Sequence, residues 1–216
     1  MNNKFLTKVF GWMVVGLLVT FGTGFLVSTN QNMVANVVSG LGLFTILVVE
    51  LAVAFFFSLR ISKMSSGAAR ACFILYSFVN GLFFSTYFVY FELASLIYVF
   101  LITAIVFAIF ALIGATTKLD LSKMGSYLLM GLIAIILCGI INIFVGSSSL
   151  DFIISTIAVI VFLGYTAYDV KMIMNSDKFI AIPEENIAIY GAFQLYLDFI
   201  NLFIRLIQFF GKSHDN

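Results

Sequence analysis

Seven long apolar runs constrain this chain more than any other feature of its sequence. A helix needs about 20 apolar residues to cross the hydrocarbon core of a bilayer. The runs that meet this length are Phe5–Val27, Val34–Leu59, Ala68–Phe91, Ala94–Thr116, Met124–Val145, Phe152–Met174 and Ile187–Phe210. The connections between them are too short to hold a soluble domain. We therefore predict an all-α integral membrane protein whose residues 1–216 form a single domain of seven transmembrane helices.

The composition supports this class and excludes several others. Of the 216 residues, 62% are apolar and 10% are charged, whereas a soluble domain has about 25% charged residues. The net charge of +1 offers no basic patch for nucleic acid. Cys72 and Cys138 lie in separate apolar runs, and His214 is the only histidine, so neither a metal centre nor a nucleophile–histidine pair is expected. We predict no cofactor, no enzymatic activity, and the lipid bilayer as the main partner.

The basic residues predict the orientation of the chain. If the N-terminus is cytoplasmic, nine of the eleven basic residues fall on the inner side and none falls in the three outer loops, in agreement with the positive-inside rule. These nine are Lys4, Lys8, Arg60, Lys63, Arg70, Lys118, Lys123, Lys171 and Lys178. Seven helices then place the C-terminus outside, and the short tails favour a bacterial plasma (inner) membrane. The alternative is six spanning helices with a re-entrant or interfacial last segment.

A polar stripe follows the last apolar run. Its residues are separated by 4, 3, 4, 3 and 4 positions: Gln194, Asp198, Asn201, Arg205, Gln208 and Lys212. On an α-helix this spacing puts them on one face. The preceding run carries Asp169. Ionisable groups inside a membrane mark a pathway, a relay or a sensor, so we expect the function to depend on these last two helices and the striped helix to be enclosed by the others.

Asp169 and Asp198 are the first candidates for chemistry. The predicted helix boundaries leave them one to two turns apart in depth, so the sequence does not prove that they touch. If they meet, both cannot ionise at small cost in a low-dielectric environment, and the pair would share a proton near neutral pH. Such a pair is a pH sensor, or a cation site when both acids are ionised. The alternative is that each acid separately pairs with a base or caps a turn.

Arg60 and Glu50 are further candidates on the second run. Arg60 ends this run on the predicted inner side, where Asp169 also lies, so it could latch that carboxylate and release it on protonation. The alternative is an ordinary boundary arginine whose charge reaches the lipid headgroups. Glu50 lies ten residues earlier, near the middle of the membrane. A buried acid there needs a partner, and Arg205 is the best available base.

Gln194 and Asn201 flank Asp198 at positions i−4 and i+3. Their amide oxygens could coordinate or hydrate a passing cation as polar pore residues. Alternatively, both amides hold neighbouring helices together. The residue types and spacing leave these two roles open.

Two stretches resemble the C-terminal signature of the Bax inhibitor-1 family. They are Tyr168-Asp169-Val170-Lys171-Met172-Ile173 and Leu195-Tyr196-Leu197-Asp198-Phe199-Ile200-Asn201-Leu202-Phe203. The resemblance extends over the whole chain. It implies a central C-terminal helix wrapped by the other six and, for prokaryotic members, a pH-sensitive calcium-leak channel. It further implies that Asp169 and Asp198 form the pH-sensing pair and that Arg60 latches one of them.

Three functions are consistent with these residues. The first is a passive, proton-gated cation pathway for Ca²⁺, which Asp169 and Asp198 would bind transiently, because carboxylate and amide oxygens suit a hard cation. The second is a membrane protein that regulates a protease or another partner. The third is an intramembrane aspartyl protease, which also needs two aspartates. Two features argue against this third function. Asp198 lies in Leu-Tyr-Leu-Asp rather than the Gly-x-Gly-Asp of such proteases. Their Pro-Ala-Leu element is also absent, because the only proline is Pro183, in a loop.

Overall fold

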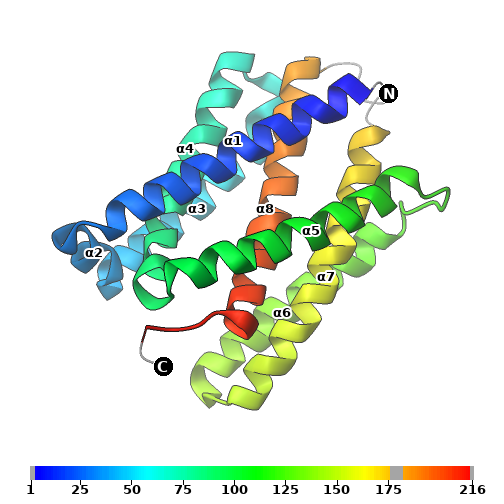
Figure 1. The fold of residues 1–216 in the computed structure, drawn as a ribbon. Helices are drawn as coiled ribbons and strands as arrows, with labels where there is room; N and C mark the ends of the chain where they lie inside the picture. The colour runs from blue at the N-terminus through cyan, green and yellow to red at the C-terminus, as the bar shows by residue number, and fades with distance from the viewer. Residues whose placement is uncertain (1–2, 176–181, 215–216) are drawn as a thin grey trace. The chain divides into compact units, whose positions relative to one another are not determined.

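The structure is a computed structural model that describes residues 3–175 and 182–214, so the predicted inner-side residue Lys178 lies outside the described residues. The described chain is helical apart from its connections and one isolated β-bridge between Phe91 and Ser213. Its helices are α1 (Asn3–Ser28), α2 (Gln31–Val38), α3 (Gly40–Arg60), η1 (Ile61–Lys63), α4 (Ser66–Tyr90), α5 (Leu93–Thr116), α6 (Met124–Val145), α7 (Ser148–Met174) and α8 (Glu184–Phe210) (Figure 1). The all-α prediction is confirmed.

Seven of the described helices are long and apolar enough to span a membrane, as the sequence predicts. The second span starts at Gly40 rather than Val34 because α2 is a separate helix. The backbone of Ser39 is extended (φ −57°, ψ 143°), which interrupts the helix, and its Oγ accepts a hydrogen bond from the Gly42 amide at 3.0 Å. This N-cap starts α3 as a new helix. The 27 residues of α8 reach about 40 Å, which is enough to span the bilayer.

The chain forms two compact units that share α8. The first unit contains residues 3–96, 182–196 and 212–214, and the second contains residues 97–175 and 197–211. Of the seven spans, α8 is the most buried: 67% of its most apolar window is buried, against 11% for α3 and for α6. Enclosure of α8 agrees with the sequence analysis, whereas the organisation of residues 1–216 as a single domain stays a prediction.

In the first unit, aromatic rings join the N-terminal half of α8 to α3 and α4. Ring centroids lie 5.0–6.3 Å apart in nearly perpendicular contacts, a geometry that aromatic pairs favour. The rings are Phe57, Phe73, Tyr76, Phe193 and Tyr196. On the α1 side, the Tyr196 hydroxyl lies 2.5 Å from Thr20 Oγ1, which donates to the Ser77 carbonyl at 2.9 Å. The Tyr196 hydroxyl therefore donates to Thr20.

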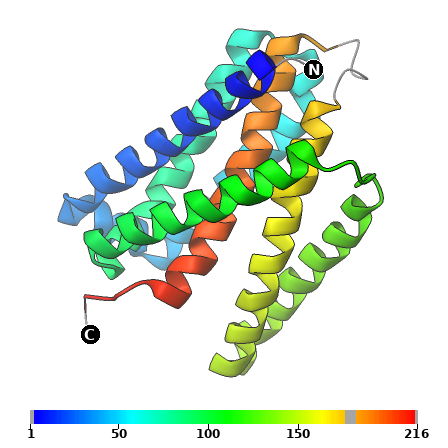
Figure 2. The same ribbon diagram turned by 45° about the vertical axis from the view of Figure 1, so that its right-hand side comes forward.

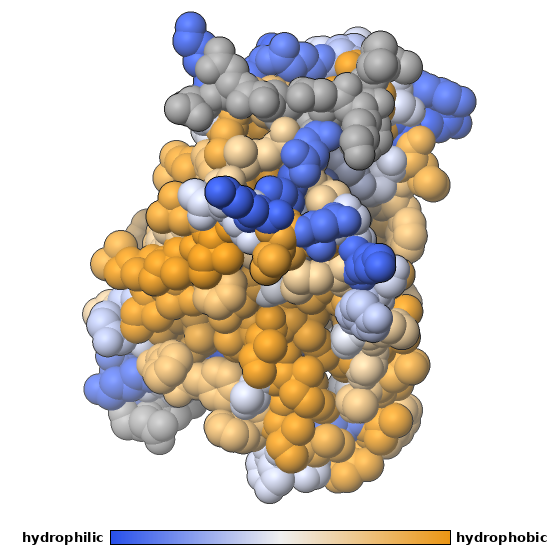
Figure 3. Space-filling view, turned by 90° about the vertical axis from the view of Figure 1, so that its right-hand side faces the viewer, coloured by the Kyte–Doolittle hydropathy of each residue, from blue (hydrophilic) through white to orange (hydrophobic). Residues whose placement is uncertain are grey.

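In the second unit, the C-terminal half of α8 packs on α5 and α7. Phe199 contacts Phe100 and Phe107 of α5 at centroid distances of 5.2 and 5.5 Å. Phe209 contacts Phe152 of α7 at 5.3 Å. Figures 1 and 2 show α6 and α7 running side by side. The surface drawn in Figure 3 is largely apolar. Exposed apolar side chains of α6 include Leu129, Ile133, Ile136, Leu137 and Ile140, as expected for a helix that faces lipid.

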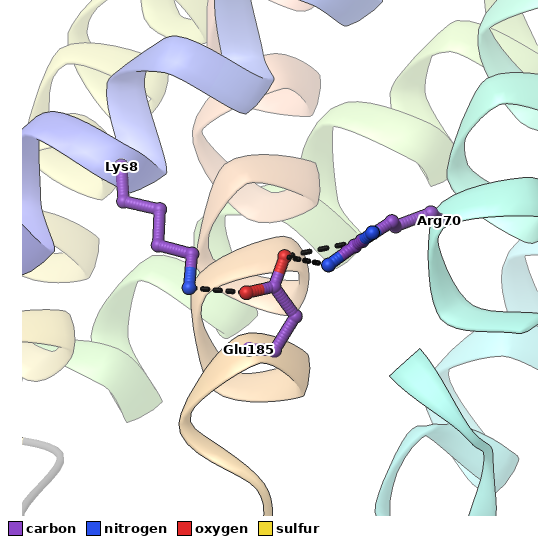
Figure 4. A network of polar contacts seen from close by, with 3 residues as sticks. All are labelled: Lys8, Arg70 and Glu185. Carbon is purple, nitrogen blue, oxygen red and sulfur yellow. Dashed lines mark hydrogen bonds and ion pairs between the residues drawn. The ribbon is translucent and has the colours of Figure 1, made fainter. Parts of the chain in front are cut away.

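A network of charges, which we call the Glu185 network, fixes the start of α8 in the first unit (Figure 4). One carboxylate oxygen of Glu185 contacts Lys8 of α1. The other accepts hydrogen bonds from Arg70 of α4, at 3.2 Å from Nε and 2.9 Å from Nη2. The Arg70 guanidinium also lies 5.8 Å from the centre of the Trp12 ring. The network therefore ties α1 and α4 to the first turn of α8, where a negative charge also complements the helix dipole.

Asn186 makes a second connection at the start of α8. Its side chain is fully buried. Its Nδ2 donates to the carbonyl oxygens of Ile61 and Met64, at 3.0 and 2.8 Å. These carbonyls follow the end of α3, so the amide fixes the α3–α4 connection to α8. The sequence analysis did not identify Asn186 or Glu185.

Replacing Gly81 of α4 with alanine should destabilise the protein. A Cβ at Gly81 would lie 2.8 Å from the carbonyl oxygen of Thr20 and 2.6 Å from Cβ of Thr23, and overpacking of this kind costs about 1–3 kcal/mol. The matched control is Gly22→Ala on α1, where nothing lies within 4 Å of the added atom. Thermal unfolding in detergent should show a lower Tm for Gly81→Ala only. Equal Tm values would contradict the close α1–α4 packing.

Replacing Glu185 with glutamine should also lower Tm, because Lys8 and Arg70 lose the carboxylate between them. Hydrogen bonds to charged groups contribute about 1.5–3 kcal/mol, so a loss of this order is the upper limit for the partly exposed network. Glu184→Gln is the control, since Glu184 is the exposed neighbouring acid of the same helical turn. Thermal unfolding of both variants in the same detergent tests the prediction. Equal effects would mean that the network contributes nothing specific.

Candidate functional site

The structure brings Asp169 of α7 and Asp198 of α8 together. Their carboxyl groups lie close enough to interact, and each residue is only 5% exposed. A hydrogen bond between two carboxyl groups requires a proton on one of them. The structure therefore supplies the proximity on which the sequence analysis made proton sharing conditional, and the shared proton itself stays a prediction. Asp198 Oδ2 is buried and has no hydrogen-bond partner among the described residues.

Close packing fixes the turn of α7 that carries Asp169. A Cβ at Gly114 of α5 would lie 2.2 Å from the carbonyl oxygen of Ala167, and one at Gly125 of α6 would lie 2.6 Å from the Tyr168 hydroxyl. Only glycine permits such close approach. Lys171 Nζ donates to the Thr117 carbonyl at 2.6 Å, just after the end of α5. A cation at a helix C-terminus is favourable, and these contacts hold the Asp169 turn against α5 and α6.

Tyr165 also belongs to this site, although the sequence analysis did not identify it. It lies one helical turn before Asp169, is half-buried, and is close enough to Asp169 and Asp198 to sense their charges. The spacing of Tyr165 from Asp169 could have revealed it, because residues i and i+4 share a helix face. Tyr196, by contrast, donates to Thr20 in the first unit.

Glu50 and Arg205 each contact a neutral polar side chain within their own unit. Asn80 Nδ2 donates to Glu50 Oε1 at 2.6 Å. Arg205 Nη1 donates to Ser155 Oγ at 3.3 Å and to Gln208 Oε1 at 3.2 Å. The pairing of Glu50 with Arg205, which belong to different units, stays a prediction. A neutral amide supplies a hydrogen-bond donor without bringing a second charge into the membrane, and the sequence gives no signal for that choice.

The remaining predicted residues lie along α3 and α8. Arg60 ends α3, and its side chain is exposed. Its role as a latch stays a prediction. Gln194 is half-buried on the first-unit part of α8. Asn201 is half-buried on the second-unit part, where its Nδ2 donates to the Leu197 carbonyl of the same helix at 2.8 Å. That bond leaves the amide oxygen of Asn201 as a ligand atom for a cation.

The chemistry available to a cation here is limited. Within the described residues, no group of three or more His, Cys, Asp or Glu side chains could hold a metal ion. A cation at the carboxyl pair would therefore meet two carboxylates and otherwise neutral oxygens or water. Tightly binding calcium sites use six to eight oxygen ligands.

Comparisons with known proteins place the chain in a family. Residues 2–215 match the family described as "Inhibitor of apoptosis-promoting Bax1". An uncharacterized protein of Borreliella burgdorferi is 39% identical over 100% of this chain and 94% of its own length. Inner membrane protein YbhL of Escherichia coli K12 is 37% identical over 97% and 92%, and an uncharacterized membrane protein of Streptococcus pyogenes serotype M1 is 31% identical over 98% and 93%. The chain belongs to the Bax inhibitor-1 family and is a multi-pass membrane protein.

Proposed function

We propose that this protein is a passive, pH-sensitive leak channel for Ca²⁺ and that Asp169 and Asp198 are its proton sensor. The observation that supports this function best is the proximity of two buried carboxyl groups, one of which keeps an unpartnered oxygen. A shared proton leaves the pair with one negative charge. Loss of that proton would leave two, which a hard divalent cation neutralises well.

The proton on the pair would control permeation through Arg60. In this proposal Arg60 forms a charge-assisted bond with the ionised Asp169, and that bond weakens when Asp169 is protonated. Moderate acidification therefore opens the pathway by releasing the latch. Stronger acidification removes the negative charge that attracts Ca²⁺, so block of permeation follows as a separate effect. Ca²⁺ and H⁺ are thus transported ion and regulator, and no resident cofactor takes part.

The polar groups of α8 are the natural contacts along such a pathway. Gln194, Asn201, Arg205 and Gln208 are half-buried or exposed, whereas most of the remaining residues of α8 are buried. Amide oxygens at Gln194 and Asn201 would replace part of the hydration of the ion near Asp198. Passive flow needs only weak and multiple contacts of this kind.

We also propose that the protein lies in a bacterial inner membrane with its N-terminus in the cytoplasm and its C-terminus outside. The distribution of basic residues supports this orientation. The relative YbhL is named an inner membrane protein. A cysteine introduced at Lys4 and labelled in intact cells with a membrane-impermeant reagent would be protected in this orientation and labelled in the opposite one.

Calcium entry into sealed liposomes that contain only the purified protein tests the channel directly. We expect a leak that changes between pH 5 and 8, and we expect Asp169→Asn and Asp198→Asn each to alter that dependence, because each removes one member of the proton-sharing pair. Asp151→Asn is a matched control, since Asp151 is exposed in the first turn of α7. An unchanged pH profile in the double aspartate variant would refute the sensor.

No leak at any pH from folded, inserted protein would refute the channel. The role of a membrane protein that regulates a partner would then account best for the family membership. The aspartyl protease would remain as a further alternative, because it too uses two neighbouring carboxyl groups. Cleavage of helical membrane peptides by the purified protein, abolished by Asp198→Asn, would identify that activity.

Replacing Arg60 with methionine should raise the leak at neutral pH about tenfold, which corresponds to the loss of a charged hydrogen bond of roughly 1.5 kcal/mol. At acidic pH the variant and the unmodified protein should leak at the same rate, because protonation has already released the latch. Lys63→Met is the control, since Lys63 is an exposed base three residues later. The same liposome assay measures both. A similar increase in the two variants would mean that Arg60 acts only as a surface charge.

A further inference from the structure

A further acid inside a membrane span, the half-buried Glu50, belongs to the first unit. Glu50 is at the middle of α3, ten residues from Gly40 and ten from Arg60, which places it about 15 Å from either end of the helix. The rest of α3 before Arg60 carries no charge. An ionised carboxylate at such a depth is costly unless a base or several hydrogen-bond donors neutralise it.

The partner of Glu50 is a neutral amide. Asn80 Nδ2 of α4 donates to Glu50 Oε1 at 2.6 Å, and no ion pair involving Glu50 occurs among the described residues. Apolar side chains flank both groups: Ile46 lies one turn before Glu50 and packs with Val79, the residue before Asn80. The surroundings therefore offer one donor and little else to an ionised carboxylate.

Other titratable groups do not change this balance. The groups of α4 and α8 within electrostatic reach of Glu50 are the phenols of Tyr76 and Tyr196, which are neutral near pH 7. The residues of α2, Gln31–Val38, include no titratable side chain. The described residues of the first unit thus show no ion pair with Glu50.

The side chain of Asn80 has an acceptor oxygen without a hydrogen-bond donor. It is only 5% exposed, and its Oδ1 is a buried acceptor that receives no hydrogen bond from any described residue. Leaving a buried acceptor unpaired costs about 1–3 kcal/mol. A carboxylate cannot remove this deficiency because it only accepts hydrogen bonds. A carboxylic acid can, because it carries one O–H donor.

We propose that Glu50 and Asn80 form a proton-binding site between α3 and α4. In this site the amide donates to one oxygen of Glu50, and the protonated oxygen of Glu50 donates to Asn80 Oδ1. One proton then satisfies both the acid and the orphaned amide oxygen, and the site holds no net charge. The ligand is the proton alone. The proposal does not depend on calcium conduction, because its groups belong to the first unit and the carboxyl pair to the second.

Infrared difference spectroscopy of the full-length protein in lipid membranes tests this site, because a protonated carboxylic acid has a carbonyl band that a carboxylate lacks. At neutral pH, Glu50→Gln should remove one such band. Glutamine has the shape of the protonated acid and can pair with Asn80, so the variant should fold. Glu92→Gln is the matched control: Glu92 is ion-paired with Lys212 at 3.2 Å outside the spans, and its replacement should remove a carboxylate band instead.

A second variant tests the partner. Asn80→Leu should leave the Glu50 acid band present but move it to higher frequency, because the O–H group loses its acceptor. Loss of a carboxylate band in Glu50→Gln would overturn the proposal. An acid band that Asn80→Leu leaves unchanged would overturn the acid–amide pairing. Calcium flux separates this proposal from the channel proposal. If the unmodified protein leaks, Glu50→Gln should keep its pH profile between pH 5 and 8. The infrared bands test the Glu50–Asn80 site whether or not the protein leaks.

Discussion

An acid placed inside a membrane must lose its charge or share it, and this constraint explains the polar contacts of the molecule. Asp169 and Asp198 lie beside each other, an arrangement that a single shared proton would stabilise. Glu50 contacts a neutral amide. Glu185, in the first turn of α8, instead has two bases as partners. Full ion pairs therefore occur near a helix end, where water and headgroups reduce their desolvation, and neutral or proton-sharing contacts occur deeper in the helices.

Glycine residues of α5 and α6 allow the close helix packing that positions Asp169. The approach of Gly114 to Ala167 and of Gly125 to Tyr168 brings α5 and α6 against the turn that carries Asp169. In a membrane, association of helices depends on such close packing, because lipid is as apolar as the side chains that it contacts. The Asp169 carboxyl is consequently presented from a fixed backbone.

The sequence predicts the helices well and their contacts poorly, and the reason is physical. The length and hydropathy of each run determine whether it can span, so all seven spans are confirmed. The sequence analysis missed the break at Ser39 because a single serine does not interrupt the apolar run in which it lies. The polar stripe on α8 identifies Asp198 as a candidate residue, but its contact with Asp169 depends on helix tilt and depth. These are set by packing such as that of Phe199 on Phe100 and Phe107, which no local pattern encodes.

Partner choice was hardest to predict because charge complementarity is a poor guide in a low-dielectric environment. Asn80 is a partner of Glu50 that charge alone does not predict, because an amide supplies a donor to a carboxyl oxygen without the cost of desolvating a second ion. The carboxyl pair and the Glu50–Asn80 site also differ in the net charge that each carries when a proton is bound. In the proposed function, the carboxyl pair gains or loses one charge while its members stay beside each other. An acid paired with an amide is neutral when protonated, and loss of its proton leaves a single unscreened charge. The pair is therefore suited to switching, and the acid–amide site is suited to holding α3 and α4 together without charge.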